Sequence, residues 1–338
     1  MASTPSPASS PIFIDAESLR ATLSHSSLIQ HFQTSLPAVA ATLHTPIRQS
    51  YAVSPTSNLL LMPSWSTSPS SSLPYIGVKL VTHFPQNSHL HSLPGIHASY
   101  VLFSSATGQT LATMDGTLLT LYRTSCVSGL ASKLLARADS RVLVMVGAGA
   151  LAPHLIRAHL AARPGLREVI IWNRTQSKAA ELAEKLNYEL GGGGGGVSCR
   201  SGGEDLDEVI GLGDIVSCAT NNADAAPLVK GEKLKRGAHL DLVGSFKENM
   251  RECDDAALRR AGAVFADNEA ALVEAGELVG GFERGVIEKG EVGLLVELIK
   301  GERAGRKDCD EITVFKSVGS AVVDMLAAQF AYEARARK

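Results

Sequence analysis

The segment that most constrains the fold of this chain runs from residue 142 to residue 175. An apolar run, Val142–Val146, leads into Gly147-Ala148-Gly149-Ala150-Leu151-Ala152, and a second apolar run ends in Trp172-Asn173-Arg174-Thr175. This order is typical of a strand, a glycine turn, a helix and a second strand. We therefore expect an α/β fold that contains a dinucleotide-binding parallel sheet.

The glycine turn assigns a role to each of its small residues. Gly147 would allow the tight turn, Gly149 would let a pyrophosphate approach the backbone, and Ala152 would permit close packing of helix on strand. The diphosphate would lie beside Ala150 and Leu151, where the unpaired N–H groups of a helix N-terminus favour an anion. Glycine turns also serve ordinary strand-to-helix corners, but here both strands and the helix are present. The turn therefore predicts a bound dinucleotide.

The residues after the second strand distinguish between the two nicotinamide cofactors. An NAD site usually places Asp or Glu here to bind the ribose 2′-hydroxyl, whereas a 2′-phosphate requires a cation and neutral donors. The chain has Asn173, Arg174 and Thr175, followed by Lys178, and no carboxylate before Glu181. This pattern favours NADPH, with weaker binding of NADH. The alternative is that Arg174 is an ordinary surface arginine.

Composition argues against several classes of protein. The chain has 338 residues, enough for two domains, and its net charge of −2 at pH 7 indicates no nucleic-acid partner. No segment approaches the roughly 20 apolar residues of a membrane span, so we expect no membrane partner. The cysteines occur singly and without metal-site spacing, which predicts reduced thiols and no metal. They are Cys126, Cys199, Cys218, Cys253 and Cys309.

The first ten residues are rich in Ser, Ala and Pro and contain no acidic residue. Organellar transit peptides share these properties, but residues 1–10 also lack the arginine that such peptides carry. We expect a disordered leader, and the compartment stays open on this pattern.

Two patterns divide the part of the chain before the glycine turn. Up to residue 115 the sequence predicts short strands separated by turns, with one early helix at about Glu17–Leu36. Helical spacing of apolar residues then predicts a helix over 115–136 that leads into the glycine turn. The expected strands are Ile12–Ile14, Ser50–Val53, Leu59–Met62, Ile76–Thr82, Ala98–Ser104 and Thr110–Met114.

After the glycine turn, helices and buried strands alternate, as in a doubly wound sheet. The Gly191–Gly196 run is predicted to form a loop, because glycine loses the most conformational freedom when it is ordered. A long amphipathic helix is expected from Val314 to Arg335. The other expected elements are helices at 150–162 and 176–186 and strands at 215–219 and 239–243.

The chain has no nucleophile elbow or paired carboxylates, so the chemistry is expected to belong to the cofactor. A small anionic substrate would then need cations for charge-assisted hydrogen bonds. Three cations stand in suitable settings: Arg48 after Thr45-Pro46-Ile47, Lys79 within the apolar run 76–81, and Arg123 after Leu121-Tyr122. A lysine inside an apolar strand must reach water or find an anion. The alternative for each is a cation that is paired for structural reasons.

Five separate segments of the chain resemble the ornithine cyclodeaminase and mu-crystallin family. Their order and spacing match over about residues 12–333, and the resemblance is closest to plant ketimine reductases that make pipecolate in systemic acquired resistance. Segments 59–65 and 94–100 carry this closer likeness. The five family segments are 114–124, 147–152, 172–175, 237–245 and 312–319.

The resemblance implies two domains. A Rossmann domain that binds NADP would span 123–312, and an α+β substrate and dimerisation domain would span 11–122 and 313–338, completed by the C-terminal helix. The resemblance also implies a homodimer, and the plant relatives make a plastid location an alternative to the cytoplasm.

The resemblance implies roles for individual residues as well. Arg48, Lys79 and Arg123 match the family positions that hold the substrate carboxylate. The family positions that line the cofactor are matched here by Thr124, Gly149, Asn173, Arg174, Thr175, Ala219, Thr220, Val243 and Ser317.

One residue departs from the cyclodeaminase pattern. In the cyclodeaminases the segment that matches Val243-Gly244-Ser245 is followed by an aspartate, which acts as a base and pairs with the ammonium group of ornithine. In this chain the segment is followed by Phe246. An aromatic ring cannot accept a proton or pair with an amine, and Asp241 is offset along the strand. Phe246 would instead form an apolar wall beside the substrate ring.

The resemblance to the family, together with Phe246 in place of the aspartate, implies that the protein reduces a preformed cyclic ketimine with NADPH. The expected reaction converts Δ1-piperideine-2-carboxylate to pipecolate, or Δ1-pyrroline-2-carboxylate to proline, in lysine catabolism and plant immune signalling. The proton would come from Lys79 or solvent. The alternatives are an ornithine cyclodeaminase, an amino-acid dehydrogenase of the same family, or a non-catalytic binding protein like the crystallins.

Overall fold

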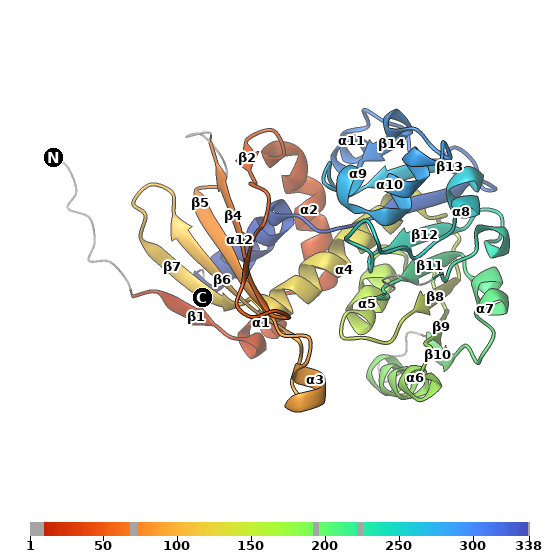
Figure 1. Ribbon diagram of the computed structural model, residues 1–338, viewed down its shortest axis with the longest axis horizontal. Coiled ribbons are helices and arrows are strands. Elements are labelled where there is room, and N and C mark those ends of the chain that lie inside the picture. The colour runs from red at the N-terminus through yellow and green to blue at the C-terminus, as the bar shows by residue number, and fades with distance from the viewer. Residues whose placement is uncertain (1–9, 68–72, 192–195, 222–225, 337–338) are drawn as a thin grey trace. The chain divides into compact units, whose positions relative to one another are not determined.

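The computed structural model of the chain describes residues 10–67, 73–191, 196–221 and 226–336. It divides the chain into two compact units (Figure 1). The first unit comprises Met1–Ser24, Thr34–Arg123 and Ala321–Lys338. The second unit comprises His25–Gln33 and Thr124–Ser320. The fold confirms the predicted α/β class with a dinucleotide-binding sheet.

The first unit is built on a seven-stranded sheet in the order β1-β7-β6-β5-β4-β2, with β3 also paired to β4. β1 runs parallel to β7, and the other pairs are antiparallel. The strands are β1 (Ile12–Ile14), β2 (Leu43–His44), β3 (Gln49–Ala52), β4 (Asn58–Ser66), β5 (Tyr75–His83), β6 (Ile96–Ser104) and β7 (Thr110–Asp115).

Side chains alternate between the two faces of this sheet. On β5, Tyr75, Gly77 and Lys79 are buried, whereas Ile76 and Val78 between them are half-exposed. The buried face packs against α12, which contacts both β4 and β5. The unit's helices are α1 (Ala16–Thr22), α3 (Asn87–Leu90) and α12 (Ala321–Ala336), with parts of α2 (His25–Val39) and α4 (Gly116–Leu135).

The second unit is built on an eight-stranded parallel sheet in the order β10-β9-β8-β11-β12-β15-β13-β14. The first five strands repeat the 3-2-1-4-5 order of dinucleotide-binding domains. The strands are β8 (Val142–Val146), β9 (Glu168–Trp172), β10 (Ser198–Ser201), β11 (Ile215–Cys218), β12 (His239–Leu242), β13 (Ala261–Ala266), β14 (Val292–Leu294) and β15 (Ile312–Lys316).

Apolar side chains cover both faces of this sheet. On β8, Val144 and Val146 belong to one buried cluster, whereas Leu143 and Met145 belong to another. A strand that is buried on both faces reads as a continuous apolar run, as β8 does in the sequence. The helices of this unit are α5 (Ala152–Ala162), α6 (Gln176–Gly191), α7 (Leu206–Leu212), α8 (Asp255–Arg260), α9 (Ala271–Glu274), α10 (Gly276–Glu283) and α11 (Leu295–Lys300).

The predicted C-terminal helix over 314–335 is wrong at its start. Residues 312–316 form β15, which pairs with β12 and β13, and the helix begins only at Ala321. Val314 and Phe315 are fully buried in the sheet, and Gly319 breaks the chain direction with a φ of +83°. The domain boundary predicted at residue 313 therefore falls inside a strand of the second unit, which extends to Ser320.

The predicted N-terminal helix and the predicted glycine loop also differ from the structure. The helix expected over 17–36 is two helices, α1 and α2, because Leu23 adopts an extended conformation after α1. α6 continues to Gly191, and most of the rest of the predicted glycine loop lies outside the described residues. The leader predicted over residues 1–10 also lies outside them, apart from Ser10. Of the helices in the described part of the chain, none combines the length and the apolar character needed to cross a membrane.

Candidate functional site

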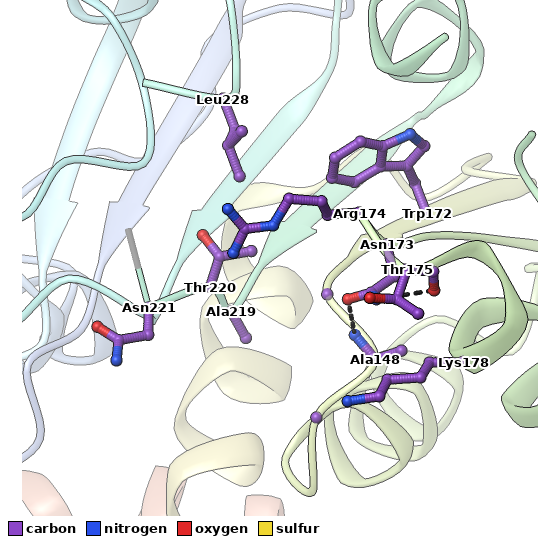
Figure 2. A pocket seen from close by; sticks show the side chains of 12 residues that line it. Ala148, Trp172, Asn173, Arg174, Thr175, Lys178, Ala219, Thr220, Asn221 and Leu228 are labelled. Atoms are coloured by element: carbon purple, nitrogen blue, oxygen red, sulfur yellow. Dashed lines mark hydrogen bonds between the residues drawn. The ribbon is translucent and has the colours of Figure 1, made fainter. Parts of the chain in front are cut away.

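A pocket of about 330 Å³ opens in the second unit at the carboxyl ends of β8, β9 and β11 (Figure 2). This edge of a doubly wound sheet is the usual place of a dinucleotide. Among the residues that the structure describes, those that line the pocket include no Asp or Glu. They are Gly147, Ala148, Gly149, Trp172, Asn173, Arg174, Thr175, Lys178, Ala219, Thr220, Asn221 and Leu228.

The glycine turn has the geometry that its sequence predicts. Gly147 has a φ of +113°, and a Cβ at this position would lie 2.7 Å from the carbonyl oxygen of Ala219. Only glycine fits such a position without strain. A Cβ at Gly149 would meet no atom within 4 Å, so the backbone there borders open space. The turn can therefore admit a diphosphate against its backbone.

The end of β9 is held to the glycine turn by Asn173. Its Oδ1 accepts a hydrogen bond of 3.2 Å from the Ala148 N–H, and its Nδ2 donates to the Thr175 carbonyl at 2.9 Å. Arg174 and Lys178 are exposed, and Figure 2 shows the Arg174 side chain extending toward Thr220. Two cations at a pocket whose described lining residues include no carboxylate suit a polyanionic ligand.

The predicted cofactor residues fall into two groups. Eight of them line the pocket: Gly147, Gly149, Asn173, Arg174, Thr175, Lys178, Ala219 and Thr220. The other five do not line it: Thr124, Ala150, Leu151, Val243 and Ser317. Two of these, Val243 and Ser317, follow β12 and β15 at the same edge of the sheet, where each N–H donates to the neighbouring strand.

Glu252, which sequence reasoning missed, joins the ends of β11 and β12. It is fully buried, and its carboxylate accepts hydrogen bonds from the N–H groups of Thr220 at 2.8 Å and Gly244 at 2.7 Å. Burial raises the pKa of Glu252, and the Lys316 ammonium 3.7 Å away opposes this shift. Glu277 lies 3.6 Å from the same ammonium. We call Glu252, Glu277 and Lys316 the acidic cluster.

A second buried charge cluster lies in the first unit. The Lys79 Nζ donates to the Asp324 Oδ2 at 2.7 Å, and the Arg123 Nε lies 2.9 Å from Oδ1. The Arg123 contact is an ion pair whose angle does not meet that of a hydrogen bond. Lys79 is 3% exposed, Arg123 7% and Asp324 1%. We call these three residues the basic cluster.

The structure therefore brings two of the three predicted cations together around a carboxylate that sequence reasoning missed. Asp324 stands in an apolar stretch of α12, Val322-Val323-Asp324-Met325-Leu326, and this isolated charge is the signal that could have found it. Arg48, the third cation, is half-buried between β2 and β3, and its charge acts on Lys79.

The charges of the basic cluster shift one another's pKa values. Burial lowers the pKa of Lys79 to about 8, with Arg123 and Arg48 acting in the same direction and Asp324 opposing them. Burial raises the pKa of Asp324, but Arg123 and Lys79 outweigh this and hold it below its usual value. Two cations and one anion leave a surplus positive charge, which can hold an anionic substrate group.

The two other residues discussed for substrate chemistry lie in the second unit. Phe246 is 38% exposed, and the Lys247 Nζ lies 5.8 Å from the centre of its ring. Asp241 is fully buried, accepts from the Ser217 Oγ at 2.7 Å and lies 3.2 Å from the His159 Nε2. Asp241 is thus engaged inside the sheet domain and does not replace the cyclodeaminase base.

The whole described chain is similar to one family of proteins. The family model for the ornithine cyclodeaminase/mu-crystallin family matches residues 11–338. The chain is 62% identical to Protein SAR DEFICIENT 4 of Arabidopsis thaliana over 96% of this chain and 97% of that protein. It is 34% identical to a Δ1-pyrroline-2-carboxylate reductase of Colwellia psychrerythraea over 95% of this chain and 98% of that protein.

A solved structure gives the same assignment. The Δ1-pyrroline-2-carboxylate reductase of Thermococcus litoralis, in complex with NADH and L-proline, superposes with a TM-score of 0.87 at 29% identity. The match covers 96% of this chain and 98% of that one. The family model and these relatives match nearly the whole chain, and this chain belongs to the ornithine cyclodeaminase/mu-crystallin family.

Proposed function

We propose that this protein reduces a cyclic ketimine carboxylate with NADPH. The substrate is Δ1-piperideine-2-carboxylate, which yields pipecolate, or its five-membered analogue Δ1-pyrroline-2-carboxylate, which yields proline. The observation that carries the proposal is the basic cluster, where buried Lys79 and Arg123 exceed the charge of Asp324. The relatives named Δ1-pyrroline-2-carboxylate reductase support the same class of substrate.

The pocket around the glycine turn favours NADPH over NADH. Arg174 and Lys178 both border the pocket, and the described part of its lining has no carboxylate to bind a ribose 2′-hydroxyl. A guanidinium can bind a phosphate through two parallel hydrogen bonds, which adds affinity for the 2′-phosphate. The similar structure from Thermococcus litoralis holds NADH, so the preference of this chain rests on its own cations.

The cofactor, when bound, supplies a hydride to the imine carbon. The protein's own residues orient the substrate and manage its charge. Arg48 and Arg123 hold the substrate carboxylate, which fixes the position of the adjacent C=N bond. The Lys79 Nζ donates a proton to the ring nitrogen, so that one C–H and one N–H bond replace the π bond of the imine. A lysine with a pKa near 8 is a suitable acid at neutral pH.

Phe246 supports reduction over cyclodeamination. Its ring can contact an apolar substrate ring but can neither take a proton from ornithine nor pair with its ammonium group. The buried position of Asp241 supplies no alternative base. The protein should therefore accept a preformed imine and leave ornithine unchanged.

The experiment that tests this function is NADPH oxidation against a panel of substrates. The panel contains both cyclic ketimine carboxylates, ornithine, and pyruvate with ammonium, and mass spectrometry identifies each product. Turnover of a ketimine to its cyclic amino acid is expected. Release of ammonia from ornithine would show that the protein is a cyclodeaminase. Turnover of pyruvate with ammonium, but of neither ketimine, would show that it is an amino-acid dehydrogenase.

The first unit also supports a homodimer. The sheet face opposite α12 carries half-exposed apolar side chains, with Ile76 and Val78 on β5 opposite Phe103 and Val101 on β6. Such a continuous apolar face suits a second copy of the chain. Val78→Lys should convert a dimer to a monomer in light scattering after size-exclusion chromatography. A monomeric unmodified protein would exclude the dimer.

A further inference from the structure

The Asp324 carboxylate contacts both cations of the basic cluster, one with each oxygen. It reaches Lys79 on β5 with Oδ2 at 2.7 Å and Arg123 on α4 with Oδ1 at 2.9 Å. We propose that Asp324 is the positioning residue of the reduction: it directs the Lys79 ammonium, keeps it protonated, and anchors Arg123 by its Nε. This inference rests on the proposed function, because it assumes that Lys79 is the proton donor.

The packing of α12 fixes the place of Asp324 independently of its ion pairs. A Cβ added to Gly77 would lie 2.0 Å from the Tyr100 Oη and 2.9 Å from the Met325 Cε. The Tyr100 hydroxyl also contacts the Met325 Sδ at 3.7 Å. Gly77 therefore lets the first turn of α12 approach the sheet next to Lys79. A carboxylate that is held by its helix can orient the longer and more flexible side chains of Lys and Arg.

The anchoring of Arg123 leaves the rest of its guanidinium for the substrate. Asp324 contacts the Nε side, and over residues 10–67, 73–191, 196–221 and 226–336 no other ion pair of Arg123 occurs. The two terminal nitrogens of a guanidinium form the fork that binds a carboxylate. One internal carboxylate thus holds Arg123 in place without occupying the fork.

The charged and titratable groups around Lys79 come from four parts of the first unit. Asp324 on α12 favours the ammonium, whereas Arg123 on α4 and Arg48 between β2 and β3 disfavour it. Tyr100, opposite Lys79 in the register with β6, stays neutral because burial raises the pKa of its hydroxyl. Asp324 is the one carboxylate among these groups, so its removal should make Lys79 lose its proton at lower pH.

The test compares the pH dependence of ketimine reduction in the unmodified protein and in Asp324→Asn. The matched control is Glu333→Gln, the same change on the same helix, where the carboxylate accepts from the Tyr75 hydroxyl at 3.1 Å. In Asp324→Asn the midpoint of the alkaline loss of kcat should fall by about 1–3 pH units. The control should keep the midpoint. The substrate's own titration is common to all three proteins, so a difference in midpoint reports on the protein.

A lower kcat for Asp324→Asn with an unchanged midpoint would overturn the inference, since it would reduce Asp324 to a structural role. If this variant does not fold, Asp324→Glu provides the test. It retains the charge and should keep the midpoint while the displaced carboxylate lowers kcat, and a midpoint that falls would contradict the inference.

A measurement without turnover separates this inference from the proposed function. The pH dependence of Lys79 acetylation by acetic anhydride, read by mass spectrometry, reports the same proton equilibrium. If the unmodified protein reduces no ketimine, the proposed function fails. The effect of Asp324 on Lys79 would still show as a lower labelling midpoint in Asp324→Asn, and equal midpoints would overturn it.

Discussion

The two buried charge clusters of this protein have opposite compositions. The basic cluster combines two cations, Lys79 and Arg123, with one carboxylate, whereas the acidic cluster combines two carboxylates with one cation, Lys316. Both are almost completely removed from water. A buried charge is tolerated only when it is paired or hydrogen-bonded, so each surplus charge must find a partner.

The surplus charges are satisfied in different ways. In the acidic cluster backbone N–H groups complete the carboxylates: Thr220 and Gly244 donate to Glu252, and the Glu252 N–H donates to Glu277 at 2.7 Å. In the basic cluster the backbone does not offset the positive surplus: among the described residues no backbone carbonyl accepts a hydrogen bond from Lys79 or Arg123. A cluster that the backbone completes holds strand ends together, whereas a basic cluster with surplus charge is suited to bind an external anion.

The largest effect is expected from a substitution in the acidic cluster. Glu252→Gln removes one of the two carboxylates near Lys316 and places an amide beside three backbone N–H donors. Breaking a buried ion pair by removal of one charge costs about 3–5 kcal/mol of the free energy of unfolding. Thermal and urea unfolding should reveal a loss of this size, together with weaker NADPH binding because Thr220 borders the pocket. Unchanged stability would contradict the structural role.

Removal of a cation from the basic cluster should affect catalysis more than stability. Arg123→Ala should lower kcat/KM for the ketimine about 100-fold or more, because the substrate carboxylate loses its fixed position. NADPH binding, measured by fluorescence titration, should be retained, because the predicted dinucleotide residues lie in the second unit. Near-normal turnover of the variant would remove Arg123 from the carboxylate site.

The surplus charge of the basic cluster should also show in the pH dependence. Lys79 acts as an acid, so the active form is the ammonium, and burial lowers its pKa to about 8. Activity is therefore present below this pH and is lost as pH rises through it. A kcat profile for NADPH oxidation tests this directly. Constant activity through pH 8 and well above it would indicate solvent as the proton source.

The smallest expected effect concerns the exposed cations of the pocket. Arg174→Ala should weaken NADPH binding about 10-fold or more, in line with the loss of one charge-assisted hydrogen bond of about 1.5–3 kcal/mol. NADH affinity should change far less, because NADH lacks the 2′-phosphate. Competition titrations with both cofactors provide the comparison. Equal losses for NADPH and NADH would show that Arg174 does not contact the 2′-phosphate.

The sequence alone determined the local architecture around the pocket at the glycine turn. Val142–Val146 predicts β8, and the positive φ of Gly147 explains why the turn begins with glycine. Asn173, Arg174 and Thr175 follow β9 directly, so their place in the pocket follows from the same short segment. The strand and the turn were predictable because periodicity and glycine geometry act between residues that are close along the chain.

Only the tertiary structure decided how the buried charges are partnered and where the C-terminal segments belong. Lys79 and Asp324 are 245 residues apart in the chain, and Glu252 joins strand ends through backbone groups that have no signature in the sequence. Val314 and Phe315 fit an apolar helix stripe as well as a strand, and only pairing with β12 and β13 selects the strand. Local patterns indicate which side chains are buried, but contacts between segments that are distant in the sequence determine which residues they pack against.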